Sequence, residues 1–289
     1  VIRPRFADAQ FFFDEDLKQG IDSMAQGLAS VTYQQKLGSY ADKTARIATL
    51  AESIATQLGM DSSQARRAAE LSKADLQSRM VGEFPELQGI AGRYYAKAAG
   101  ESDAIANAID EAYQPRFGGD AIAESKLGQV IAIAERLDTL AGGFAAGLKP
   151  TGNKDPFALR RNALGLARTL LEGNFDLSLR DLFVLARDLQ PVESKNDEIN
   201  ELEKLELERF TYDRLRNYFS EQGFSEQQFD AVLAIEPASL PDFAKRLAAV
   251  AEFTKLPEAA SLAAANKRIA NILRKSANEA AQHVSESLL

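Results

Sequence analysis

Apolar residues recur every three or four positions along most of the chain, which is the spacing of one face of an α-helix. The clearest example begins at Leu37 and continues to Leu58. Gly59 then provides a helix stop, and Asp61 with Gln64 three residues later predicts a capping box for the next helix. The same pattern predicts further helices over residues 85–99, 102–113, 121–140, 155–171, 178–189, 202–222, 225–234, 240–253 and 259–284.

The pattern predicts an all-α fold, because no convincing hairpin interrupts the helical spacing. Residues 1–6 alternate apolar with basic side chains and are predicted to be the last strand of a preceding domain. Residues 191–208 are rich in Asp and Glu and are predicted to connect two helical domains. The expected organisation is a tail and linker over 1–21, a first helical domain over 22–190 and a second over 191–289.

Composition narrows the possible functions. The chain has 289 residues, of which 45% are hydrophobic and 26% charged, a balance typical of a soluble globular protein. There is no Cys, and His283 is the sole His, so the sequence argues against disulfides, zinc ribbons, thiol nucleophiles and Ser-His-Asp triads. No window approaches the roughly 18 apolar residues of a membrane span. The chain starts without Met or a signal segment and is interpreted as a piece of a longer cytoplasmic protein.

The formal net charge of −8 means that any contact with nucleic acid must be local. One local cluster of cations surrounds the expected helix start at 155, where Asp155 is predicted as the N-cap and Pro156 as the first helical residue. Exposed N–H groups at a helix start, together with Lys and Arg, suit phosphate oxygens. The alternative is a solvated rim whose arginines pair with carboxylates. The candidate phosphate contacts here are Lys149, Lys154, Arg160, Arg161 and Arg168.

A second cluster lies in the predicted second domain, where cations alternate with aromatic residues. This combination can hold backbone phosphates and stack on unpaired bases. The alternative is a set of amphipathic helices whose long cationic side chains cover apolar surface. Tyr218 is the candidate for base stacking. The candidate phosphate contacts are Arg214, Arg216, Lys267, Arg268, Arg274 and Lys275.

Several long blocks of the sequence are similar to one family of proteins. The blocks are MVGEFPELQG at 80–89, GRYY at 92–95, RLDTLAG at 136–142, GLKPTGNKDPFALRR at 147–161, DRLR at 213–216, QGFS at 222–225 and ANKRIANIL at 265–273. They resemble the β subunit of bacterial glycyl-tRNA synthetase, and the similarity extends over nearly the whole chain.

The resemblance implies that the chain is the C-terminal half of the β subunit. It implies a heterotetramer of two α and two β subunits, in which α carries the active site for glycine and ATP and β binds the glycine tRNA. The expected partners are therefore glycine tRNA, the α subunit and a second β subunit, and no membrane. ATP and Mg²⁺ would be used by the α subunit, and no cofactor would be bound by this chain.

The resemblance also implies that the first domain has the fold of HD phosphohydrolases and the second that of the helical anticodon-binding domain named for Asp-Ala-Leu-Arg. A working HD site needs two metal-binding His, an adjacent Asp and a distal Asp. Here the expected dyad reads LSKAD at 71–75, the distal position is Glu135, and the domain has no His. The sequence therefore predicts a non-catalytic, tRNA-binding chain without a metal site. The alternatives are a docking module for α–β or β–β assembly and a metal-dependent phosphohydrolase.

Overall fold

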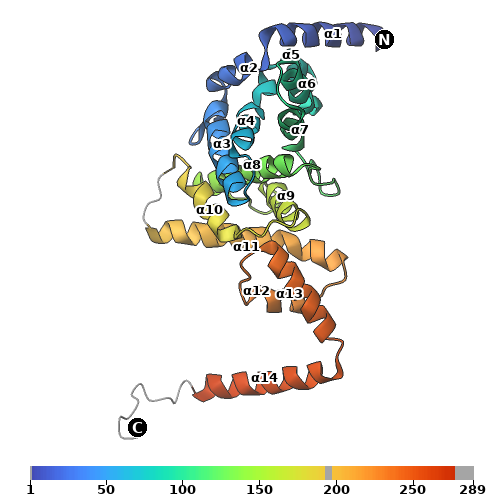
Figure 1. Ribbon diagram of the computed structural model, residues 1–289. Helices are drawn as coiled ribbons and strands as arrows, with labels where there is room; N and C mark the ends of the chain where they lie inside the picture. Colours follow the sequence, from blue (N-terminus) through green and yellow to red (C-terminus); the bar gives the residue numbers. More distant parts are fainter. Residues whose placement is uncertain (1, 193–196, 277–289) are drawn as a thin grey trace.

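The computed structural model describes residues 2–192 and 197–276, which form an elongated and almost entirely helical molecule (Figure 1). Its first part consists of α1 (Ile2–Gln19), α2 (Ile21–Gly27), α3 (Tyr40–Gln57), α4 (Ser62–Leu71), α5 (Arg79–Glu83), α6 (Ile90–Ala98) and α7 (Asp103–Glu111), with 3-10 turns at Leu28–Ser30, Ala74–Gln77 and Pro85–Leu87. Its second part consists of α8 (Lys126–Ala145), α9 (Leu159–Glu172), α10 (Leu179–Asp188), α11 (Asp197–Glu221), α12 (Glu226–Leu233), α13 (Leu240–Phe253) and α14 (Pro257–Ser276). The prediction of an all-α fold is confirmed.

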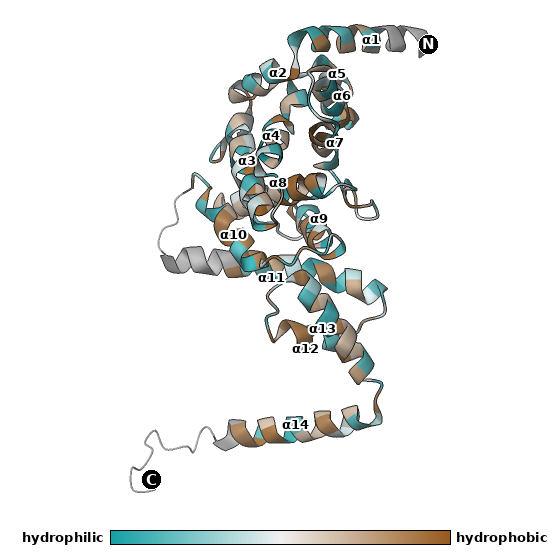
Figure 2. Ribbon diagram, viewed as in Figure 1, coloured by the Kyte–Doolittle hydropathy of each residue, from teal (hydrophilic) through white to brown (hydrophobic). Residues whose placement is uncertain are grey.

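Helix α8 forms the centre of the molecule. It contacts α3, α4 and α7 on one side and α9, α10 and α11 on the other. Its side chains are buried on every face, from Val130 through Leu137 to Phe144. Figure 2 shows hydrophobic residues concentrated in α7, α8 and α10, at the middle of the structure. A helix that is buried on every face needs neighbours on every side, and α8 therefore organises the helices around it.

Helices α11, α12 and α13 continue the same core. Helix α11 packs on α8, α9 and α10, and α13 packs on α9. An aromatic cluster joins α11 to α12 and α13, with the ring centroids of Phe229 and Phe243 4.8 Å apart and those of Phe219 and Phe243 5.7 Å apart. The predicted boundary at 191 lies between α10 and α11, and the division into two domains stays a prediction.

The predicted strand at residues 1–6 is wrong, because the chain is helical from Ile2 to Gln19. Helical spacing brings Phe13 and Asp16 of α1 onto the rest of the molecule. The ring of Phe13 stacks on Tyr95 at 5.5 Å, and the buried carboxylate of Asp16 accepts hydrogen bonds from Tyr95 Oη and the backbone N–H of Met80. These contacts favour one long helix over the strand that the alternation of six residues predicted.

A small antiparallel hairpin was missed by the sequence analysis. It pairs β1 (Thr32–Gln34) with β2 (Gly38–Ser39), and both strands are too short to show a period of two. The helix predicted from residue 37 begins at Tyr40 instead. Its start is set by a capping box in which Ser39 and Asp42 exchange hydrogen bonds between side chain and backbone.

The predicted start of the helix at residue 155 is also wrong. Helix α9 begins at Leu159, after Ala158 adopts a left-handed conformation with φ 51°. Asp155 nevertheless caps this helix, because its carboxylate oxygens accept from the backbone N–H groups of Leu159 at 2.7 Å and Arg160 at 2.9 Å. The capping function was predicted correctly and its position along the helix was not.

Helix α14 extends away from the other helices at the C-terminal end of the described chain (Figure 1). The helix predicted over 259–284 is observed as far as Ser276, and His283 lies outside the described residues. In the ranges 2–192 and 197–276, no helix is long and apolar enough to cross a membrane.

Candidate functional site

The first cationic cluster is only partly free to bind a ligand. Lys149 forms an ion pair with Glu206 of α11, Arg160 donates to the carbonyl of Gly152, and Arg168 pairs with Glu172 at 2.6 Å. Carboxylates therefore occupy Lys149 and Arg168, as the alternative interpretation expected, whereas Arg160 is held by a backbone carbonyl.

Two cations of the same cluster remain exposed. Lys154 lies in the loop before α9 and Arg161 in its first turn, and neither has a carboxylate partner among the residues that the structure describes. The N–H groups at the start of α9 are not exposed to a ligand as predicted, because Asp155 already accepts from two of them. Any phosphate contact in this region must therefore come from the side chains.

The second cluster is not brought together by the fold. Arg216 pairs with Asp213 and Asp230, and Arg214 lies 5.4 Å from the ring centroid of Phe210. Tyr218 packs edge-on against the ring of Phe219 and donates to Glu172 at 3.3 Å. Burial raises the pKa of the Tyr218 hydroxyl. This tyrosine is therefore held against α9 rather than presented as a free surface for stacking.

The remaining cations of that cluster lie on α14, which Figure 1 places well away from α11. Lys267 and Arg268 are exposed there. The predictions at Arg274 and Lys275 concern side chains outside the described residues. The α11 and α14 cations thus form separate surfaces rather than one site.

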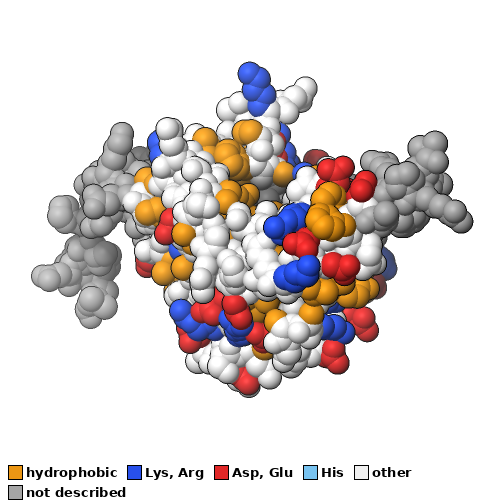
Figure 3. Space-filling model, turned by 90° about the horizontal axis from the view of Figure 1, so that it is seen from above, with side chains coloured by type: hydrophobic (Ala, Val, Ile, Leu, Met, Phe, Trp, Pro, Cys, Tyr) orange, Lys and Arg blue, Asp and Glu red, His pale blue; other side chains and the backbone are white. Residues whose placement is uncertain are grey.

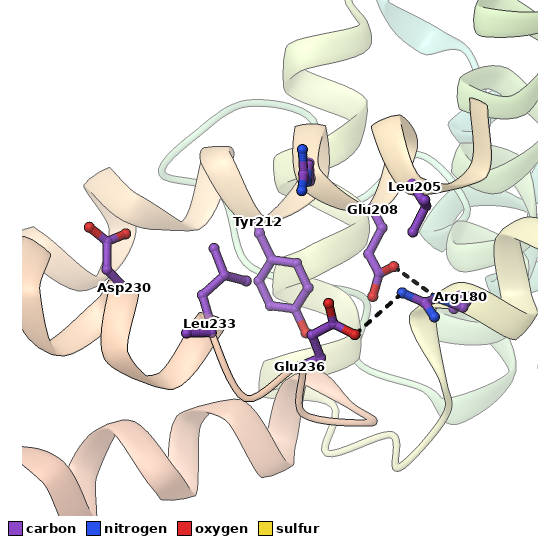
Figure 4. A pocket seen from close by; sticks show the side chains of 9 residues that line it. Arg180, Leu205, Glu208, Tyr212, Asp230, Leu233 and Glu236 are labelled. Carbon is purple, nitrogen blue, oxygen red and sulfur yellow. Dashed lines mark hydrogen bonds and ion pairs between the residues drawn. The ribbon is translucent and has the colours of Figure 1, made fainter. Parts of the chain in front are cut away.

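A groove between α10, α11 and α12 encloses about 320 Å³ (Figure 4). Tyr212 and Leu233 form part of its apolar wall, and Arg180 reaches across to Glu208 at 3.1 Å and to Glu236 at 3.8 Å. Burial raises the pKa of the Tyr212 hydroxyl, so this group stays protonated. Both carboxylates that the figure connects pair with the one guanidinium group of Arg180, and among the described lining residues no pair of groups is arranged for acid–base catalysis.

A second cavity, of about 220 Å³, lies where the HD resemblance places its site. Sequence reasoning had singled out Lys73 and Glu135 there, but it missed the other lining residues because these come from distant parts of the chain. We call this space the Lys73 cavity. Its lining consists of Tyr33, Tyr40, Lys43, Lys73, Leu76, Gln88, Tyr113, Glu135, Thr139, Phe157 and Asn162.

Two lysines converge on one carboxylate in the Lys73 cavity. Lys43 Nζ lies 3.7 Å from Glu135 Oε1, and Lys73 Nζ lies 3.6 Å from the same oxygen. Lys43 also donates to Asp138 at 2.9 Å and to Thr139 at 2.7 Å, so its ammonium group is well satisfied. Lys73 instead lies 3.9 Å from the ring centroid of Tyr113.

These contacts shift the ionisation of the three groups in different directions. Burial lowers the pKa of Lys73, and the charge of Glu135 offsets this only in part. Burial also opposes the charged form of Lys43, but Asp138 and Glu135 outweigh it and raise the pKa of that lysine. Burial would raise the pKa of Glu135, yet Lys73 and Lys43 lower it to about 2. Glu135 is therefore ionised at neutral pH.

The residues at this position do not fit a metal ion. Asp75 is directed away from the cavity, and its Oδ2 accepts from the backbone N–H groups of Gly89 at 2.6 Å and Gly92 at 3.0 Å. Two ammonium groups flank the one remaining carboxylate, Glu135, and would repel a cation. Within the described part of the chain, no three His, Cys, Asp or Glu side chains are grouped to hold a metal.

The depressed pKa of Glu135 predicts a contribution to stability that depends on pH. The pKa is about 2 in the folded chain and ordinarily 4.5, so the contribution is complete above pH 4.5 and is lost as the pH falls towards 2. Its size is about 3 kcal/mol. In Glu135→Gln we expect lower stability at neutral pH and a shallower loss between pH 4.5 and 2, measured by urea unfolding at a series of pH values.

The matched control for this experiment is Glu252→Gln, which removes a carboxylate from an exposed ion pair with Lys255. Its stability should follow the pH dependence of the unmodified chain. An equally steep acid loss in Glu135→Gln and the unmodified chain would contradict the assigned role of Glu135.

Comparison with known proteins shows extended similarity. A family model described as glycyl-tRNA synthetase beta subunit matches residues 1–234. The glycine–tRNA ligase beta subunit of Xanthomonas campestris pv. campestris (strain 8004) is 64% identical over 291 residues, covering 100% of this chain and 42% of the relative. The corresponding subunit of Xylella fastidiosa (strain 9a5c) is 53% identical, covering 95% of this chain and 42% of the relative.

These matches also bear on the extent of the chain. It spans 42% of the length of the Xanthomonas and Xylella relatives, and 40% of the relative from Janthinobacterium sp. (strain Marseille), which is 50% identical. The prediction that the chain is the C-terminal half of the subunit is not upheld, because the matched part is less than half of the relatives.

Proposed function

Because the chain belongs to the glycyl-tRNA synthetase β-subunit family, we propose that it is a non-catalytic, tRNA-binding part of a glycine–tRNA ligase. In this proposal an α subunit carries out the ATP- and Mg²⁺-dependent reaction in the cytoplasm, and this chain helps to hold the glycine tRNA. The observation that carries the proposal is the 64% identity over the whole chain to a protein named as the β subunit of that ligase.

The surface charges support a local contact with RNA rather than a broad one. Figure 3 shows Lys and Arg interspersed with Asp and Glu on the face seen from above, without a large area of one sign. This mixture agrees with the net charge of −8. The phosphate contacts that we favour are Lys154 and Arg161, because both are exposed and lack carboxylate partners in the described ranges.

We expect the double variant Lys154→Glu/Arg161→Glu to bind glycine tRNA at least tenfold more weakly. Each cation that neutralises a phosphate contributes about 0.7–0.9 to the slope of log affinity against log salt, so the slope should become shallower by about 1.5. The measurement is equilibrium binding of the chain to glycine tRNA, and to one unrelated tRNA, across a salt series.

The control is Lys18→Glu/Lys255→Glu, which changes the net charge equally at exposed lysines that already pair with Glu15 and Glu252. If both double variants weaken binding to the same degree, the effect is one of overall charge and the assignment to Lys154 and Arg161 fails. If neither changes binding, a docking role within the subunit assembly is favoured, and co-elution with the α subunit would test it.

A further inference from the structure

The Lys73 cavity contains a buried cation that is incompletely satisfied. The side chain of Lys73 is 7% exposed. It donates no hydrogen bond to any residue in the described ranges, and its charged contact there is the Glu135 oxygen at 3.6 Å, which Lys43 shares. A buried ammonium group normally has close hydrogen-bonding partners, because burial without them is costly. Lys73 therefore lacks an acceptor among the described residues, and the cavity of about 220 Å³ beside it offers space for one.

The charges around the cavity point to a negatively charged ligand. Asp138 is shared between Lys43 and Arg46, and Arg136 donates to backbone carbonyls of the 112–115 segment. The charged residues that line the cavity are Lys43, Lys73 and Glu135, which are two cations and one carboxylate.

The walls of the cavity suit a flat ring. The ring centroid of Tyr33 lies 5.3 Å from that of Tyr40 and 6.5 Å from that of Phe157, in edge-to-face contacts. Tyr113 adds a further ring beneath Lys73. Aromatic side chains in such an arrangement can stack on a nucleobase regardless of its sequence identity.

Polar groups in the walls could bind the edge of a base. Asn162 uses its amide nitrogen to donate to the carbonyls of Phe157 and Ala158, which leaves its amide oxygen as an acceptor. Glu135 Oε1 lies 3.6 Å from Lys73 Nζ, so a phosphate at Lys73 has to approach the ammonium group from the side away from Glu135. The amide oxygen of Asn162 is then the acceptor for the amino group of a base.

We propose that the Lys73 cavity binds one nucleoside monophosphate unit, through an anion contact to Lys73 and aromatic contacts to the base. This site goes beyond the proposed binding of tRNA, because it does not require the surface cations. The unit could be a free nucleotide or an unpaired nucleotide of a bound RNA. The segment that supplies Phe157 and Asn162 to the cavity also carries the exposed cations Lys154 and Arg161. The cavity and the favoured phosphate contacts therefore share one segment of the chain.

The test is calorimetric titration of the chain with GMP, AMP, CMP, UMP and inorganic phosphate. We expect mononucleotides to bind more tightly than inorganic phosphate. Bases with an amino group should bind more tightly than uracil. Lys73→Met should weaken mononucleotide binding at least tenfold, while Lys97→Met, at an exposed lysine paired with Asp103, should leave it unchanged.

A second variant separates the two halves of the ligand. Phe157→Leu should weaken binding of mononucleotides and leave binding of inorganic phosphate unchanged, because it removes only an aromatic wall. Thermal unfolding of each variant shows whether its fold is kept. The proposal is overturned if no mononucleotide binds to the unmodified chain, or if folded Lys73→Met binds mononucleotides as the unmodified chain does.

Competition with glycine tRNA distinguishes the source of the nucleotide. Displacement of bound GMP by the tRNA indicates that a nucleotide of the RNA enters the cavity, whereas simultaneous binding indicates a free nucleotide. If the unmodified chain binds glycine tRNA but no mononucleotide, the cavity site is refuted and the proposed function is not. Mononucleotide binding by a chain that does not bind tRNA would refute the proposed function and leave the cavity site standing.

Discussion

Asp138→Ala should lower the free energy of unfolding by about 3–5 kcal/mol, the range typical for breaking a buried ion pair by removing one partner. The side chain of Asp138 is 0% exposed and lies 2.9 Å from Lys43 Nζ and 2.6 Å from Arg46 Nε. It also accepts from the amide of Gln190 at 3.1 Å, which joins the end of α10 to α8. Alanine would leave buried Arg46 without its carboxylate partner, and Lys43 would keep only Glu135, which it shares with Lys73.

Urea unfolding followed by circular dichroism measures this loss. Glu252→Ala provides the comparison, since it removes a carboxylate whose partner Lys255 is exposed and remains solvated, so little change is expected. Asp138→Asn should be intermediate, because the amide keeps one acceptor oxygen but loses the charge. A change for Asp138→Ala no larger than that of the comparison would refute the role assigned to this ion-pair network.

Phe243→Ala should destabilise the chain by about 3–5 kcal/mol, as is usual when a buried phenylalanine leaves a cavity. Phe243 is 0% exposed. Its ring centroid lies 4.8 Å from that of Phe229 and 5.3 Å from that of Tyr212, so one substitution removes contacts to both α12 and α11. The loss should be seen as a lower urea midpoint.

The matched control is Phe253→Ala on the same helix, where the side chain is 42% exposed and little change is expected. Equal effects of the two alanine variants would contradict the packing of Phe243.

The experiment also tests the predicted boundary at residue 191. Two separate domains would give two transitions, of which Phe243→Ala shifts only one. A single transition that shifts as a whole would show that α11 to α13 unfold together with the preceding helices.

Local patterns in the sequence predicted most of the helices correctly. The helix expected over 240–253 is α13, and those expected over 178–189 and 225–234 are α10 and α12. Their limits follow from residues at their own ends, such as Ser178, Ser225 and Ser239, each of which caps the helix that follows it. The signals fail where they are short: six alternating residues suggested a strand inside α1, and the hairpin at 32–39 was missed.

The candidate sites were less predictable, because they depend on partners that are distant in sequence. Lys149 was expected to be a phosphate contact, but it pairs with Glu206, 57 residues further along the chain. The resemblance to the HD fold identified Lys73 and Glu135 as altered site positions. It did not show that Lys43 would join them, because the position of Lys43 depends on a hydrogen bond to Asp138, which is 95 residues away in sequence.

The sequence by itself therefore determined the helical class, the cap at Asp61 and the membership of the β-subunit family. These depend on the period of apolar residues, on side chains within a few positions of each helix end and on long matched blocks. The packing around α8 decided which cations are neutralised, which are exposed at Lys154 and Arg161, and which face the Lys73 cavity. A helical period specifies which face of a helix is buried, whereas the partners of that face are set by how the helices pack against one another.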